Sequence, residues 1–229
     1  MSENGFFFNP NEFTGKSMSN KKYGFVLSPC KLCGLFKNCN SPKMLPFGNN
    51  KKRILVVGEA PGSDEDEEGI QFVGRSGKLL KTSLSDFNIN LDDDCVRTNV
   101  QQCFVEGNQF IPEKTEFCYS RLEEQIKEAS PQLILCFGRE ASRRIIENSI
   151  VPGMSKDDAF GLVQGDVYIS RKYNCWVSLN YHPAYILRND DMLDLFYINL
   201  SKGLEHLGKE LPELMIDNPK AKNHYVDGN

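Results

Sequence analysis

Short apolar runs alternate with amphipathic stretches along the central part of the chain. Four runs of apolar and β-branched residues stop at glycine or polar residues, which predicts buried strands over residues 53–57, 95–100, 133–137 and 175–179. A shorter run at residues 168–170 predicts an edge strand. Elsewhere apolar residues recur every three or four positions, which predicts helices over residues 74–87, 112–129, 139–147 and 189–207.

Strands that alternate with helices imply βαβ crossovers and a mostly parallel sheet covered by helices on both faces. In such α/β folds the functional residues lie in loops that follow the carboxyl ends of the strands. Three of these loops carry side chains that can do chemistry: residues 58–62, 99–103 and 180–188. We therefore expect the functional site at this edge of the sheet.

Polar segments lie at both ends of the chain. We expect residues 1–26 to form a flexible extension, residues 27–208 a single domain and residues 209–229 a polar tail. No stretch approaches the roughly 18 apolar residues that span a bilayer, and the N-terminus lacks a basic region followed by an apolar core. These features predict a cytoplasmic protein without a membrane segment or signal peptide.

Net charge narrows the range of nucleic-acid binding modes. The 229 residues include 27 lysines and arginines and 31 aspartates and glutamates, a formal charge of −4. This balance argues against a protein that coats DNA or RNA with its whole surface. It leaves room for a basic face on an acidic body, because local fields decide binding.

Eight cysteines are few for a disulfide scaffold of this length, so we expect reduced thiols. Cys30 and Cys33 form a C-x2-C pair, and Cys103 and Cys118 follow much later, 15 residues apart. Four thiolates can hold zinc or an iron–sulfur cluster, and the residues alone leave both open. Cys39 is a further thiol near the first pair. The others lie inside predicted strands, where small buried side chains are expected: Cys95, Cys136 and Cys175.

The loop after the first predicted strand contains Gly58 and Gly62, which would let a ligand approach the backbone closely. It has neither a P-loop ending nor a G-x-G-x-x-G pattern, so a nucleotide site is unsupported. Glu59 in this loop is a candidate base or electrostatic group, or else a solvated carboxylate. The acidic run at residues 64–68 is more typical of a solvated turn than of a cation site. His182 follows the last core strand, where a loop would present it for catalysis.

The segment before the first predicted helix carries a third set of candidates. Phe72 adjoins a glycine-rich turn and is either a stacking platform for a base or a core residue. Arg75 and Lys78 lie near the start of the helix, where they could meet phosphates.

Six of these motifs occur together, in order and at similar spacing, in one enzyme family. The chain resembles the family 4 uracil-DNA glycosylases, the iron–sulfur branch of the uracil-DNA glycosylase superfamily, over residues 27–205. The matching segments are Cys30-x2-Cys33, residues 58–62, 72–75 and 98–103, Cys118, and residues 182–188.

The resemblance implies a three-layer α/β/α sandwich with a central four-stranded, mostly parallel sheet. It also implies a [4Fe–4S] cluster with a structural or DNA-orienting role, held by Cys30, Cys33, Cys103 and Cys118. Cys39 falls outside the family pattern, so we expect that it is not a ligand.

The reaction implied by the resemblance is hydrolysis of the N-glycosidic bond of deoxyuridine in DNA, which releases uracil and leaves an abasic site. A flipped uracil would stack on Phe72 and pair through its O4 and N3–H edge with the Asn99 amide. Cytosine presents the opposite pattern and would leave an unpaired donor. Backbone groups of Gly58 and Ala60 would complete the pocket, and uracil-containing DNA is the expected partner.

The resemblance also implies catalytic and DNA-binding roles. His182 would stabilise the charge that develops on uracil O2. Glu59 would position or activate the water, or stabilise the cationic sugar. The DNA contacts would be an apolar wedge, Ile186 or Leu187, and phosphate-binding cations, Arg75, Lys78 and Arg188.

Departures from the family pattern leave alternatives open. Many members carry Arg-Pro-Pro where residues 104–106 of this chain are Phe-Val-Glu, which removes a cation and adds an acid on the DNA side. We expect a monomeric glycosylase with a replication or repair protein as an additional partner. One alternative is a glycosylase-like DNA- or uracil-binding module with weak or no catalysis, in a replication or viral assembly. Another is an iron–sulfur redox or sensor protein.

Overall fold

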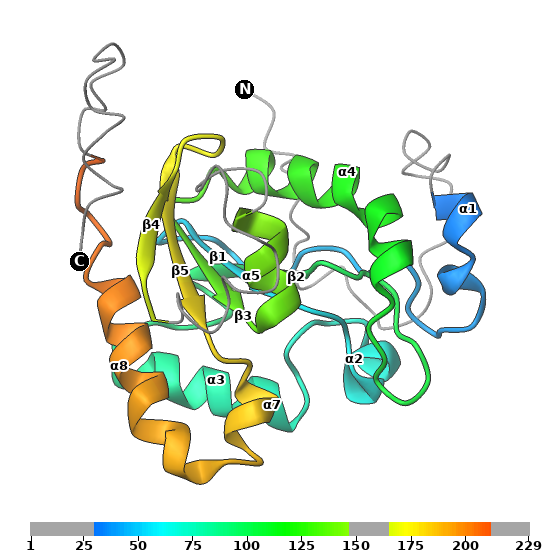
Figure 1. Ribbon diagram of the computed structural model, residues 1–229, viewed down its shortest axis with the longest axis horizontal. Helices are drawn as coiled ribbons and strands as arrows, with labels where there is room; N and C mark the ends of the chain where they lie inside the picture. Colours follow the sequence, from blue (N-terminus) through cyan, green and yellow to red (C-terminus); the bar gives the residue numbers. More distant parts are fainter. Residues whose placement is uncertain (1–29, 147–164, 212–229) are drawn as a thin grey trace, which may run out of the picture.

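The computed structural model describes residues 30–146 and 165–211, so residues 1–26 of the expected extension and 212–229 of the tail lie outside it. Five strands form one sheet in the order β2-β1-β3-β5-β4, with helices on both faces (Figure 1). The strands are β1 Ile54–Gly58, β2 Cys95–Asn99, β3 Leu133–Phe137, β4 Val167–Ser170 and β5 Cys175–Asn180. The predicted three-layer α/β fold is confirmed.

The sheet contains four parallel strands, as predicted, and one antiparallel edge strand. β1 pairs in parallel with β2 and β3, and β3 pairs in parallel with β5. β4, the predicted edge strand, adds a fifth member antiparallel to β5. Every residue of β1 and β3 is buried, whereas β4 is fully buried only at Ser170. Burial on both faces explains why β1 and β3 are continuous apolar runs rather than alternating ones.

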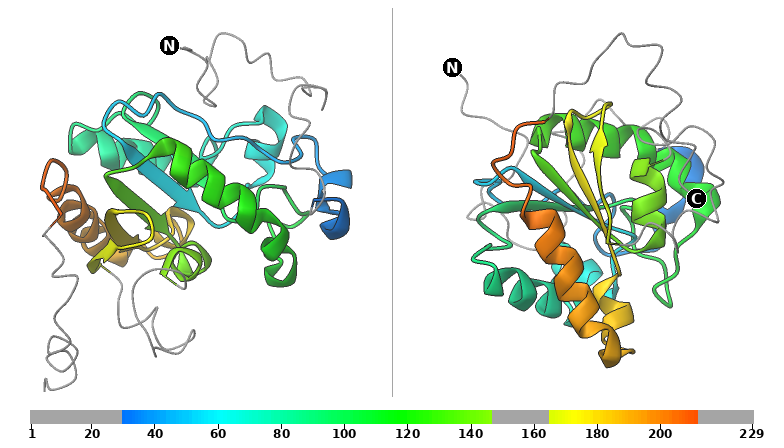
Figure 2. Two further views of the ribbon diagram at one scale, coloured as in Figure 1. Left: turned by 90° about the horizontal axis from the view of Figure 1, so that it is seen from above. Right: turned by 60° about the vertical axis from the view of Figure 1, so that its left-hand side comes forward.

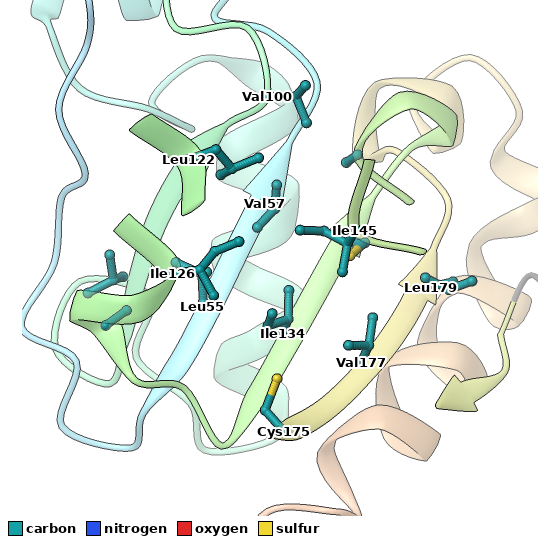
Figure 3. Packing of buried hydrophobic residues seen from close by; sticks show 14 residues of the cluster. Leu55, Val57, Val100, Leu122, Ile126, Ile134, Ile145, Cys175, Val177 and Leu179 are labelled. Carbon is teal, nitrogen blue, oxygen red and sulfur yellow. The ribbon is translucent and has the colours of Figure 1, made fainter. Parts of the chain in front are cut away.

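Alternate residues of the core strands face two hydrophobic layers, one on each side of the sheet. On one side α4, Pro112–Ala129, and α5, Arg139–Ile146, pack on the strands (Figure 3). The residues in this layer include Leu55, Val57, Leu122, Ile126, Ile134, Ile145 and Val177. On the other side lie α3, Arg75–Asp86, and α8, Leu193–Leu204 (Figure 2). Their layer includes Ile54, Val56, Leu80, Leu84, Leu135, Phe196 and Leu200.

The helices agree with the predicted ones except near the site. α3, α4 and α5 begin and end within about one residue of their predicted bounds. The predicted last helix is shorter than expected, because a 3₁₀ turn at Asp190–Met192 precedes α8. The segment expected to be a loop at residues 180–188 contains a short helix, α7, at Pro183–Ile186.

The acidic run predicted to be a solvated turn is instead a helix, α2, at Ser63–Glu68. Two of its carboxylates are buried, Glu65 at 7% exposure and Asp66 at 3%. The prediction was wrong because it took hydrophilic side chains to face water, whereas backbone N–H groups bind both carboxylates.

The strand register brings the functional loops together. Gly58 at the end of β1 lies opposite Asn99 at the end of β2, and Phe137 at the end of β3 lies opposite Asn180 at the end of β5. The four parallel strands therefore end at the same edge, so the loops that follow them meet there. Among the helices in residues 30–146 and 165–211, none is long and apolar enough to cross a bilayer.

Candidate active site

A cleft of about 710 Å³ opens where the loops after β1, β2 and β5 meet the start of α3. Most of the uracil, catalytic and DNA residues predicted from the sequence line this cleft: Glu59, Ala60, Phe72, Arg75, Asn99, His182, Leu187 and Arg188. Three others, Gly58, Lys78 and Ile186, lie outside its lining. The fold therefore gathers into one cleft side chains that lie far apart in the sequence.

Phe72 and Asn99 sit side by side against Gly58. Asn99 ends β2 at 4% exposure, and Phe72 is 8% exposed in the loop before α3. The Phe72 ring packs edge-on against Phe137, with ring centroids 6.3 Å apart, and lies 6.5 Å from the His182 ring and nearly parallel to it. A Cβ atom at Gly58 would come within 2.4 Å of Asn99 Oδ1 and 2.7 Å of Phe72 Cζ. Gly58 therefore contributes by leaving room for two side chains.

Glu59 directs its carboxylate at the first turn of α5. Its Oε1 accepts a hydrogen bond from the backbone N–H of Glu140 at 2.9 Å. Burial raises the pKa of Glu59, and backbone hydrogen bonds from Glu140 and Arg139 oppose that rise. Gly138 makes this position available: its φ is +97°, and a Cβ atom there would lie 2.5 Å from Glu59 Oε1. Gly138 begins one of the four segments that follow predicted strands, but sequence reasoning assigned it no role, because glycine commonly ends a strand and does not by itself indicate a contact with another loop.

His182 is oriented by the chain that follows it. Its Nδ1 accepts a hydrogen bond from the backbone N–H of Ala184 at 3.1 Å, at the start of α7. A neutral imidazole that accepts at Nδ1 carries its proton on Nε2. Burial lowers the pKa of His182 to about 4, and the nearby Arg188 cation acts in the same direction. His182 is consequently a neutral ring at pH 7, with an Nε2–H group to donate.

The rim of the cleft carries the residues expected to touch DNA. Arg75 and Arg188 are exposed in its lining, while Lys78 is exposed on α3 outside it. Leu187 is 42% exposed, whereas Ile186 is 2% exposed and packs in the core beneath α7. Of the two apolar residues expected as a wedge, only Leu187 is placed to reach a partner, because the turn of α7 points Ile186 inward.

Two further parts of the lining were not predicted from the sequence. The loop after β2 folds back and brings Asn108 to the cleft, with φ at +54° and with its Oδ1 accepting a hydrogen bond from Ser63 N–H at 3.1 Å. Glu65 of α2 also lines the cleft. The Gly-Asn pair at residues 107–108 is a turn signal, but nothing in the sequence indicates that the turn faces the cleft.

Three of the four predicted cluster cysteines surround a second, much smaller cavity. Cys33, Cys103 and Cys118 are 6%, 4% and 4% exposed, and Lys43 and Arg121 share the cavity wall. The backbone N–H of Lys43 donates to Cys103 Sγ at 3.2 Å. In the described part of the chain, no three His, Cys, Asp or Glu side chains are grouped as ligands of one metal ion.

Of the remaining cysteines, two lie near this cavity in the sequence or in space and three lie in the core strands. Cys30 begins α1, Cys30–Cys33, so the C-x2-C pair occupies a single helical turn. Cys39 packs beside Cys33 and Cys103, and a hydrogen bond with the Cys103 thiol lowers the pKa of Cys39. The cysteines predicted to be small core residues are at most 1% exposed, which confirms that prediction: Cys95, Cys136 and Cys175.

Comparisons with known proteins cover most of the chain. The family model described as the Uracil DNA glycosylase superfamily matches residues 45–207. A type-4 uracil-DNA glycosylase from Archaeoglobus fulgidus is 33% identical over 189 residues, which cover 81% of this chain and 92% of that protein. One from Thermotoga maritima is 31% identical over 163 residues, covering 70% of this chain and 79% of its own length. A DNA polymerase from Bacillus phage SP01 is 25% identical over 167 residues, covering 72% of this chain but 17% of the polymerase.

Proposed function

Because this chain belongs to the uracil DNA glycosylase superfamily, we propose that it hydrolyses the N-glycosidic bond of deoxyuridine in DNA, releasing uracil and leaving an abasic site. A base inside a duplex is inaccessible, so uracil must be flipped out of the stack into a pocket. The observation that carries the proposal is the cleft, which gathers an aromatic ring, an amide and a neutral imidazole from three separate segments of the chain: Phe72, Asn99 and His182.

Recognition of uracil is assigned to Asn99 and Phe72. Asn99 lines the cleft at 4% exposure, and its side-chain amide can both donate and accept a hydrogen bond. It can therefore pair with O4 and N3–H of uracil, while the Phe72 ring stacks on the base. Gly58 keeps space for both groups, and the backbone at Ala60 closes the pocket. Cytosine would leave a buried donor unpaired, which costs about 1–3 kcal/mol.

His182 is assigned the role of stabilising uracil as it leaves. Breaking the glycosidic bond leaves negative charge on uracil, and the Nε2–H of a neutral imidazole donates to the developing charge on O2. The Ala184 N–H holds the ring in the tautomer that this requires. Such a preorganised donor contributes about 3 kcal/mol to transition-state stabilisation.

Glu59 is assigned to the positive charge of the transition state, whereas His182 is assigned to the negative charge on uracil. Backbone N–H groups at the start of α5 hold its carboxylate in place. A carboxylate fixed in this way can stabilise the cationic sugar of the transition state and orient the attacking water. We favour this over a role as mobile proton acceptor, because its backbone partners would be lost if the side chain moved.

We assign a [4Fe–4S] cluster to Cys30, Cys33, Cys103 and Cys118, with Cys39 as a non-ligand. The donor set supports this assignment: three of the thiols are buried around one cavity, and the Lys43 and Arg121 side chains on its wall would offset thiolate charge. The cluster, when bound, supplies a cross-link between α1 and α4 and takes no part in bond breaking. Since Cys103 lies four residues after Asn99, the ligands also tether the uracil pocket.

The DNA-binding roles are assigned to the rim. Arg75, Lys78 and Arg188 would meet phosphates, and Leu187 would fill the gap that the flipped base leaves in the stack. We further infer that residues 27–208 act as one domain, as a cytoplasmic monomer, with a replication or repair protein as an additional partner.

The test is release of uracil from a labelled oligonucleotide, followed by alkali to break any abasic site. Wild-type protein should cut at uracil and leave a thymine control intact. Asn99→Ala and His182→Ala should each slow release at least a hundredfold, which corresponds to about 3 kcal/mol. His206→Ala is the matched control, since His206 packs on Trp176 and is not in the lining of the cleft. Undiminished release by both cleft variants would contradict the assignment.

The phage polymerase supports a second candidate function. There the segment similar to this chain makes up 17% of a DNA polymerase, which fits a glycosylase-like module that binds uracil or DNA with weak catalysis. The same oligonucleotide separates the two functions. Retention of uracil DNA without release, by protein with a full complement of iron, would favour the binding module, whereas turnover would reject it.

A further inference from the structure

Helix α2 buries two adjacent carboxylates, which is unusual for a helix of sequence Ser-Asp-Glu-Asp-Glu-Glu. A buried carboxylate needs hydrogen-bond donors, and both find backbone N–H groups. Asp66 accepts from the N–H groups of Asn40 and Ser41, each at 2.9 Å. Glu65 points the other way, toward the cleft. Two neighbouring acids of one helix therefore bind different parts of the molecule.

Glu65 joins two loops of the uracil pocket. Its Oε2 accepts from the N–H of Gly62 at 3.0 Å, at the end of the loop after β1. Its Oε1 accepts from the N–H groups of Val73 at 2.9 Å and Gly74 at 2.8 Å, immediately after Phe72. Hydrogen bonds to an ionised acceptor are about twice as strong as neutral ones, so one side chain holds both loops firmly.

The backbone that Glu65 holds is strained. Phe72 has φ at +56°, in the left-handed region that bulky residues rarely adopt. Such a conformation persists only where the surroundings impose it. On the helix side, α3 packs directly on the Phe72 backbone, since a Cβ atom at Gly77 would lie 1.9 Å from the Phe72 carbonyl oxygen. On the other side, Glu65 binds the two N–H groups that follow.

We propose that Glu65 is a positioning residue for uracil recognition, which holds Phe72 in its left-handed conformation so that the ring stands ready before the base arrives. The proposal rests on the function proposed above, because it takes Phe72 to be the stacking platform. Stacking contributes to the bound base and to the transition state alike. Loss of Glu65 should therefore weaken uracil binding more than it slows the chemical step.

The test compares Glu65→Gln with Asp66→Asn. Each change keeps shape but replaces one acceptor oxygen by an NH2 group that faces a backbone N–H. In Glu65→Gln the inhibition constant for free uracil and the KM for uracil DNA should rise at least about tenfold, with kcat within about threefold of wild type. Asp66→Asn should lower the melting temperature about as much as Glu65→Gln does. Its inhibition constant for uracil should nevertheless stay within about twofold of wild type.

Two outcomes overturn the proposal. One is an inhibition constant for uracil in Glu65→Gln that stays within twofold of wild type, and the other is a rise in that constant that is equal in both variants. If Glu65→Gln does not fold, amide hydrogen exchange of the wild-type protein decides. The N–H groups of Val73 and Gly74 should be protected although they precede α3, and exchange at the unfolded rate would overturn the proposal. Wild-type protein that neither releases nor binds uracil would reject the proposed function itself, and the exchange measurement would still test whether Glu65 holds the backbone at Val73 and Gly74.

Discussion

Substitution of Gly138 by alanine tests whether the position of Glu59 matters. Gly138 has φ at +97°, so alanine introduces backbone strain of about 1–2 kcal/mol. The new Cβ atom would also lie 2.5 Å from Glu59 Oε1 and 2.6 Å from its Cδ, so the carboxylate must move. The hydrogen bond from Glu140 N–H would then be lost, at a cost of about 1.5–3 kcal/mol for a charged acceptor.

These contributions add to a predicted destabilisation of about 2.5–5 kcal/mol for Gly138→Ala. Gly208→Ala is the matched control, because Gly208 has φ at +79° and a Cβ atom there would meet nothing within 4 Å. The control should show the strain alone, about 1–2 kcal/mol. Urea unfolding measures both values.

Catalysis should separate the two variants more clearly than stability does. Displacement of the Glu59 charge by Gly138→Ala should slow single-turnover release of uracil about 10–100-fold, whereas Gly208→Ala should leave it unchanged. The assay uses excess enzyme, well below the melting temperature of either variant. If Gly138→Ala loses more stability than Gly208→Ala, which shows that the carboxylate has moved, and still releases uracil within threefold of the wild-type rate, the electrostatic role of a fixed Glu59 is refuted.

Three further predictions concern the pocket, the histidine and the cluster. Gly58→Ala should weaken inhibition by uracil at least about tenfold, because its Cβ atom would collide with Asn99 and Phe72, and unchanged inhibition would show that the pocket adapts. The pKa of His182 in the folded protein, about 4, lies below its ordinary value of 6.5, so the unfolded chain binds this proton more readily and stability falls as the pH drops from about 6.5 to 4. Between these pH values the unfolding free energy of the wild type should fall by up to about 3 kcal/mol more than that of His182→Gln. An equal fall in both proteins would contradict the lowered pKa of His182. Cys118→Ser should lower the iron content below about four atoms per chain and diminish the visible absorption of the purified protein, whereas Cys39→Ser should keep its full iron content. If the Cys39 variant loses iron and the Cys118 variant does not, Cys39 replaces Cys118 as the cluster ligand.

Local patterns were sufficient for the elements that make up the sheet and its two helical layers. The run at Leu133–Phe137 is apolar at every position because both faces of β3 are covered, and burial of that kind is visible in the sequence itself. The spacing of apolar residues in Pro112–Ala129 likewise predicted α4 to the residue. The strand-end rule then pointed to Asn99 and His182, since topology alone places such loops at one edge.

The same local patterns failed where a contact joined segments that are distant in the sequence. Glu65 and Asp66 looked solvated because their neighbours are acidic, and only the folded chain supplies the N–H groups that bury them. Ile186 and Leu187 are adjacent and chemically alike, yet the turn of α7 sends one into the core and leaves the other exposed. Periodicity cannot distinguish them, because a four-residue helix contains a single turn.

By itself, the sequence determined the strands and the longer helices, the parallel core and the residue types that reach the cleft. These follow from hydrophobic periodicity, from strand-end placement and from the match of six motifs to one family. Only the tertiary structure decided how those residues are held: Gly138 gives Glu59 its place, and Glu65 ties the chain around Phe72. The physical reason is that orientation depends on hydrogen bonds and close contacts between loops. Those contacts exist only after the sheet register has brought the loops together.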